Sequence, residues 1–86
     1  MAAFPYVLSV VTGTVRQEVV ARGGTVLVDV VGGMVNLVST EAADGFTAYV
    51  IHQGPDRVQV HFIGEAGLVP SWLLCEGSPA VLCLFD

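Results

Sequence analysis

Apolar and polar residues alternate along most of this chain, in short runs that are rich in valine. An alternation with a period of two, carried by β-branched side chains, favours strands over helices. Clusters of glycine, proline and aspartate separate the runs and are typical of turns between strands. These clusters lie at residues 23–24, 32–33, 44–45, 54–56, 64–67 and 77–79. The pattern predicts a single all-β domain over residues 1–86, built mostly from antiparallel meanders.

The first two Gly-Gly pairs allow the strand register to be predicted. We treat each pair as a two-residue type I′ turn, whose central residues need the positive φ angles that glycine tolerates. The first turn then places Val20 opposite Leu27 and Glu18 opposite Asp29. The second turn extends the same two faces into the next strand. Both turns predict one inner face, which holds Val15, Val19, Ala21, Val26, Val28, Val30, Val35 and Leu37.

A third hairpin, with Gly54-Pro55 at its turn, has a predicted apolar face and a predicted polar face. The apolar face holds Tyr49, Ile51, Val58, Val60 and Phe62. On the polar face, His52 lies opposite Arg57 and His61 lies opposite Ala48. Several residue pairs then separate the two imidazoles, which is too far for them to share a metal ion.

The remaining segments complete the predicted architecture. A long first strand, at about residues 6–21, bends at Gly13. A further strand begins near Leu68 and stops at Pro70, and a 3₁₀ turn follows at residues 71–73. The last strand covers residues 80–85. Six or seven strands with sharp bends predict a small antiparallel barrel, closed or half-open.

The stretch from Arg57 to Leu74 resembles the closing part of an SH3-like barrel. In that family, two strands joined by a tight distal turn lead into a glycine–apolar–Val-Pro-Ser segment and a 3₁₀ turn. Here the segment is Gly67-Leu68-Val69-Pro70-Ser71, and residues 64–66 match the distal turn. Trp72 stands where the family has asparagine, and most aromatic residues of the family's polyproline groove are missing. The resemblance implies an SH3-like shape and carries over Pro70 as a groove residue.

Few charges and many apolar side chains distinguish the composition. Hydrophobic residues make up 53% of the chain and charged residues 13%, about half the usual charged share. The net charge is −5 and the only cationic residues are three arginines, which are too few to form a phosphate-binding patch. No apolar run approaches the roughly 20 residues of a membrane-spanning helix, and the start lacks the basic region of a signal peptide. We therefore expect no nucleic-acid partner, no membrane span and a cytoplasmic or virion-associated protein that is not secreted.

Side chains with reactive chemistry are few and scattered. Cys75 and Cys83 lie eight positions apart, without the spacing of a zinc site. We interpret them as two reduced thiols packed as small hydrophobes, with a disulfide as the alternative. His52 and His61 have only Asp56 nearby as a carboxylate partner, which favours solvated histidines over catalytic ones. The sequence predicts no catalytic residue, no metal site and no cofactor.

The outer face of the first meander is more apolar than a solvated sheet face should be. In the predicted register, Val20, Leu27 and Val38 form a row across three strands. Val31 and Met34 form an adjacent pair, and charged residues surround both groups. An apolar stripe with a rim of mixed charge is typical of a protein–protein interface. The alternative is that the N-terminal segment or the last strand covers the stripe within the chain.

These features favour a non-enzymatic barrel module that works by assembly, as a structural or accessory subunit of a larger complex. Such a module would bind a protein partner or a second copy of itself, and a phage or virion component fits the description. A second hypothesis is a peptide- or ligand-binding adaptor with a groove near Tyr49, Pro70 and Trp72. A third is a small enzyme whose site forms at a subunit interface around His52 or His61.

Overall fold

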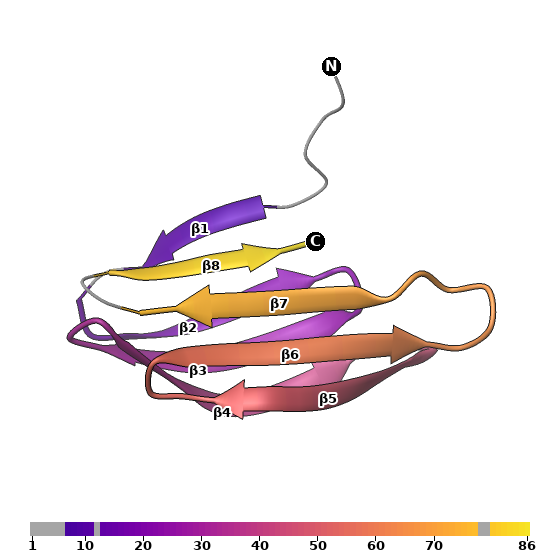
Figure 1. Cartoon of the computed structure of the whole chain (residues 1–86), viewed down its shortest axis with the longest axis horizontal. Helices are drawn as coiled ribbons and strands as arrows, with labels where there is room; N and C mark the ends of the chain where they lie inside the picture. The colour runs from indigo at the N-terminus through magenta and orange to yellow at the C-terminus, as the bar shows by residue number, and fades with distance from the viewer. Residues whose placement is uncertain (1–6, 12, 78–79) are drawn as a thin grey trace, which may run out of the picture.

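The computed structural model describes residues 7–11, 13–77 and 80–86, which form eight strands in two antiparallel sheets (Figure 1). Sheet A has the strand order β1-β8-β7-β6-β5, and sheet B has the order β2-β3-β4. The strands are β1 (Val7–Val11), β2 (Val15–Ala21), β3 (Gly24–Val31), β4 (Met34–Ala42), β5 (Phe46–Gln53), β6 (Arg57–Gly64), β7 (Ser71–Glu76) and β8 (Val81–Phe85). The all-β prediction is confirmed. The predicted barrel of six or seven strands is wrong, because the eight described strands form two separate sheets and neither closes on itself.

One hydrophobic core lies between the two sheets. Residues alternate between buried and more exposed positions along β3, β6 and β7, so each of these strands turns every second side chain inward. Sheet B contributes Val19, Ala21, Val26, Val28, Val30 and Val35. Sheet A contributes Val11, Val58, Val60, Phe62, Leu73, Cys75, Val81 and Cys83. The predicted inner face of the first meander is therefore confirmed except at its margins, where Val15 is exposed and Leu37 is only partly buried.

The Gly32-Gly33 turn forms as predicted. Both glycines have positive φ angles, 54° and 80°, and Val31 pairs with Met34. The β3–β4 connection is therefore a tight turn that only glycine occupies without strain.

The Gly23-Gly24 pair forms a different turn from the predicted one. The turn residues are Arg22 and Gly23, because Gly24 already belongs to β3 and pairs with Ala21. A Cβ atom added at Gly23 would lie only 2.5 Å from the Cβ atom of Phe62. The glycine is therefore needed for the close approach of sheet B to sheet A.

The changed turn shifts the β2–β3 register by two residues from the prediction. Val20 pairs with Thr25, and Asp29 pairs with Arg16 rather than with the predicted Glu18. Leu27 is the residue that pairs with Glu18. A shift of two residues leaves every side chain on its predicted face, which is why the inner face was correct while the cross-strand partners were wrong.

The β5–β6 hairpin contains a bulge that the sequence prediction lacked. Ile51 has no Cα partner, and the register shifts on either side of it. The turn is also longer than the predicted Gly54-Pro55 turn, because the last pair before it is Gln53 with Val58. Between the turn and the bulge, His52 therefore pairs with Gln59 instead of Arg57, and beyond the bulge Tyr49 pairs with His61 instead of Val60. The prediction that Tyr49 shares a face with Val58, Val60 and Phe62 is wrong, because Tyr49 is 53% exposed whereas those three residues are fully buried.

The first predicted strand divides at Gly13, whose φ angle is 79°. Its two halves are β1 in sheet A and β2 in sheet B, so the predicted bend serves both sheets. The strand predicted at residues 68–70 is absent, and β7 occupies the position of the predicted 3₁₀ turn. Across the described ranges, no helix is long and apolar enough to cross a membrane.

Candidate functional site: two outer faces and a polar clamp

The predicted apolar stripe lies on the outer face of sheet B. Val20, Val31, Met34 and Val38 are between 41% and 59% exposed, whereas Leu27 is half-buried. Strand β8 does not cover the stripe, because it lies within sheet A. The other predicted cover, residues 4–6, lies outside the described residues.

A row of polar side chains divides this stripe into two patches. The Arg16 guanidinium donates to both carboxylate oxygens of Asp29, at 2.7 Å from Nε and 3.1 Å from Nη2. This hydrogen bonding lowers the pKa of Asp29 below its usual value. Asn36 pairs with Asp29 on the next strand, so the polar row separates Val31 and Met34 from the rest of the stripe.

The predicted row of Val20, Leu27 and Val38 does not form. Val20 pairs with Thr25, whereas Leu27 pairs with Glu18 two residues along the ladder. Val20 and Leu27 are therefore diagonal neighbours on the outer face rather than partners. Val38 is unpaired in a bulge of β4, because Leu27 pairs with Ser39 and Val28 pairs with Leu37. The stripe is therefore less continuous than the sequence predicted.

The outer face of sheet A is also apolar, and the sequence analysis missed it. Leu74 pairs with Leu84, and Leu82 pairs with Val10 on the edge strand β1. Val10 and Leu82 are 60% and 46% exposed. The three leucines line an open hollow of about 260 Å³ together with Glu76. We call Val10, Leu74, Leu82, Leu84 and the neighbouring Trp72 the leucine face.

An aromatic row adjoins the leucine face. His61 pairs with Tyr49 on one side and with Trp72 on the other, so the structure brings together two of the three predicted groove residues. The third, Pro70, precedes β7, and its carbonyl accepts a hydrogen bond from Arg22. This row is the arrangement that the adaptor hypothesis requires.

The two histidines are closer together than the sequence predicted. His52 pairs with Gln59, and Gln59 is two residues before His61 on the same strand. The Gln59 amide nitrogen lies 3.0 Å from Nε2 of His61. The side-chain hydrogen-bonding partner of His61 is therefore an amide, whereas acid–base catalysis usually pairs a histidine with a carboxylate.

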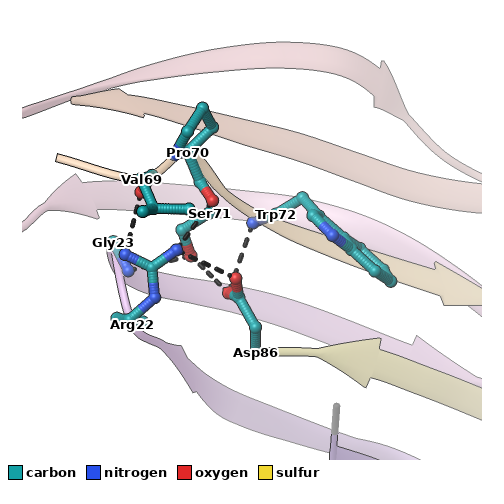
Figure 2. A network of polar contacts seen from close by, with 7 residues as sticks. All are labelled: Arg22, Gly23, Val69, Pro70, Ser71, Trp72 and Asp86. Carbon is teal, nitrogen blue, oxygen red and sulfur yellow. Dashed lines mark hydrogen bonds and ion pairs between the residues drawn. The ribbon is translucent and has the colours of Figure 1, made fainter. Parts of the chain in front are cut away.

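A network that we call the polar clamp ties the two sheets together (Figure 2). Arg22, in the β2–β3 turn of sheet B, is the cation at its centre. Its Nη1 donates to the carbonyl of Val69 at 2.8 Å, and its Nη2 donates to the carbonyl of Pro70 at 2.7 Å. Nη2 also lies 3.2 Å from the carboxylate of Asp86, directly after β8.

Ser71 forms the buried half of the clamp. Its side chain is almost completely buried, and its hydroxyl donates to the Asp86 carboxylate. The same hydroxyl accepts a hydrogen bond from the backbone N–H of Gly23 at 2.9 Å. Arg22 and Asp86 are 64 positions apart, and no local sequence motif signals such a contact.

The clamp is suited to structure rather than to catalysis. Burial alone would raise the pKa of Asp86, but hydrogen bonds from Ser71, from the backbone N–H of Trp72 and from Arg22 outweigh it and lower the pKa. A lowered pKa keeps the carboxylate ionised and therefore bonded. The Ser71 hydroxyl is enclosed and already bonded on both sides, so it is not presented to a substrate.

We expect Asp86→Ala to lower the free energy of unfolding at neutral pH by about 2 kcal/mol, because two buried donors lose their acceptor. Since folding lowers the pKa of Asp86, its contribution is complete above the ordinary aspartate pKa of about 4 and is lost as the pH falls through the lowered value. Urea denaturation across this range should show the gap between wild type and variant narrowing in acid.

Asp44→Ala is the matched control for the clamp, because Asp44 is exposed in the β4–β5 connection. Its loss should change the free energy of unfolding by less than about 0.5 kcal/mol. A gap for Asp86→Ala that stays constant down to the most acidic pH would contradict the role of the ionised carboxylate.

The interpretation of Cys75 and Cys83 as reduced thiols is wrong. They pair directly across β7 and β8 and form a disulfide. Both are fully buried, so they do pack among the core hydrophobes as expected. The spacing of eight residues fits a hairpin, but only the register shows that the two cysteines are opposite each other.

A second hollow, of about 620 Å³, opens among the turns. It is lined by Gly32, Gly33, Met34, Pro55, Asp56, Arg57, Glu76 and Gly77. Its charged side chains are two carboxylates, Asp56 and Glu76, and one guanidinium, Arg57. Within the described part of the chain, no group of three or more His, Cys, Asp or Glu residues is placed to hold a metal ion.

A scan against protein-family models, a search of curated proteins and a search of solved structures each found no match to this chain. The SH3-like resemblance therefore stays a prediction.

Proposed function

We propose that this protein is a non-enzymatic interaction module that works by assembly, as a structural or accessory subunit of a larger complex. The observation that carries the proposal is the exposure of large apolar side chains on the outer faces of both sheets. They include Val10, Val20, Val31, Met34, Val38, Tyr49 and Leu82. Scattered apolar residues are ordinary on a protein surface, but adjacent ones rimmed by charge are typical of a binding surface.

The open sheet edges support the same function. Both sheets end in strands that have one hydrogen-bonded neighbour, β1 and β5 in sheet A and β2 and β4 in sheet B. On β5, Val50 and Ile51 are 39% and 49% exposed. The chain contains no lysine, which is a common protection of exposed edges. Burial against a protein partner would cover these features.

A protein partner agrees with the charges better than a nucleic acid does. Two of the three arginines are already in ion pairs, Arg16 with Asp29 and Arg22 with Asp86. A location in a virus or phage particle is favoured over the cytoplasm, because disulfides persist on virion surfaces and are rare in reducing compartments.

The test of this function is the mass of the purified protein in solution. Light scattering at increasing concentration should give at least twice the monomer mass of 9.0 kDa. A single species at 9.0 kDa at every concentration, and in the native extract as well, would contradict the proposal.

A further inference from the structure

We propose that the leucine face of sheet A is the surface on which a second copy of this chain docks, through its own leucine face. The inference rests on the proposed assembly function and specifies its first partner and surface. A contact between identical faces closes on itself and produces a two-fold dimer.

The composition of the face is that of an interface centre. Leucine side chains from β7 and β8 lie beside one another in the ladder, and Trp72 and Tyr49 extend the surface toward β5. Apolar and aromatic residues at the centre, with polar residues at the margin, are typical of protein interfaces. Gln59 and His52 provide that polar margin on β6 and β5.

The size of the face suits a small dimer. The leucine face occupies β1, β8 and β7, which are three of the five strands of sheet A. All five strands, about 4.8 Å apart and each with about five residues at 3.3 Å, span roughly 400 Å² in projection. Protruding side chains make the accessible area larger, and stable interfaces bury about 800 Å² per partner. The polar margin on β6 and β5 is therefore needed together with the leucine face, and we expect a dimer whose population depends on concentration.

The charges favour a second copy as the occupant of this face. Among the paired residues on the outer face of sheet A, the charged side chains are Arg57 and Glu76, which lie opposite each other and have opposite charges. The outer face of sheet B instead carries Glu18 and Glu41 in addition to the Arg16–Asp29 pair. Because the chain has a net charge of −5, two copies repel each other least when they meet through the leucine face.

Contacts on the buried side of sheet A and at the start of β7 hold the leucine face rigid. The Cys75–Cys83 disulfide joins β7 to β8 on the opposite side of the sheet from the leucines. The clamp fixes the first residue of β7, Ser71, to Asp86 after β8. Figure 2 shows the Trp72 indole directed away from this clamp. Ordered side chains lose less entropy when they dock.

The test compares arginine substitutions on the two faces by light scattering. Leu82→Arg should convert the dimer to monomer at concentrations where the wild type is dimeric. The new guanidinium would lie opposite Glu76 on β7, but burying these two charges in the dimer costs more than their attraction returns. Val10→Arg, on the exposed residue opposite Leu82, should do the same and serves if Leu82→Arg fails to fold. Ala66→Arg adds the same charge to the exposed turn between β6 and β7, outside both faces, and should leave the dimer intact.

Val20→Arg, on the outer face of sheet B, separates the two proposals. If it dissociates the dimer while Leu82→Arg and Val10→Arg do not, the leucine face is not the docking surface, although the assembly function stands. If the purified wild type itself stays monomeric at every concentration, the self-docking proposal fails. The assembly function fails only if the native extract also contains the 9.0 kDa monomer alone.

Discussion

Phe62→Ala should lower the free energy of unfolding by about 3–5 kcal/mol, which is the largest loss that we expect from a single substitution. Phe62 is the largest fully buried side chain of the core, on β6 between β7 and the edge strand β5. A domain of this size is stable by roughly 4–13 kcal/mol in total. The variant should therefore be close to its unfolding limit, and urea denaturation followed by circular dichroism measures the loss.

The size of this effect follows from how closely sheet B approaches the ring. A Cβ atom added at Gly24 would lie 2.6 Å from Cε1 of Phe62, so the start of β3 rests against the aromatic ring. Removing the ring leaves a cavity that the glycine backbone does not fill. Ile63→Ala is the matched control, because Ile63 is adjacent on β6 and 45% exposed. Equal losses for the two variants would contradict the central position of Phe62.

The faces of the first meander could be predicted from sequence because they stay the same when the register shifts by an even number of residues. The true β2–β3 register differs from the predicted one by two residues, and an even shift keeps Val19 and Val26 inside and Val20 outside. The predicted register was wrong because of Gly23 and Gly24. The sequence alone does not show whether a Gly-Gly pair provides positive φ angles for a turn or space for a side chain such as Phe62.

On the third hairpin the two faces of β6 were predicted correctly, with Val58, Val60 and Phe62 buried, but the faces of β5 before Ile51 were not. A bulge at Ile51 changes the register by one residue, and an odd shift moves side chains to the opposite face. Tyr49 consequently lies outside, opposite His61. Nothing in the alternation of residues 46–53 marks the bulge, so the aromatic row was visible only in the structure.

The clamp and the leucine face were missed for a different reason, because both depend on contacts between distant segments. Arg22 meets Pro70 and Asp86 only after the two sheets have packed together. The leucines of β7 and β8 alternate with buried cysteines, a pattern that the sequence does contain. Because a 3₁₀ turn was predicted at residues 71–73, strand β7 (Ser71–Glu76) was not predicted, and the face it forms with β8 was missed.

Reduction of the Cys75–Cys83 disulfide should lower the free energy of unfolding by about 2–3 kcal/mol, the loop-closure entropy expected for a loop of this length. For a domain of this size, such a loss lowers the melting temperature by about 10–20 °C. Because both sulfur atoms are fully buried, a reductant added to the folded protein should act only as the protein unfolds. Thermal melts with and without reductant measure the difference.

The double variant Cys75→Ala, Cys83→Ala distinguishes the effect of losing the disulfide from any other effect of the reductant. Its melting temperature should be lower than that of the oxidised wild type and should not change when thiol is added. Identical melts for the oxidised and the fully reduced wild type would contradict a stabilising disulfide. The link also bears on assembly, because Leu74 and Leu84 each neighbour one of the two cysteines on paired strands. If the disulfide holds the leucine face in its docking conformation, the double alanine variant, studied below its melting temperature, should dimerise more weakly than the oxidised wild type at the same concentration.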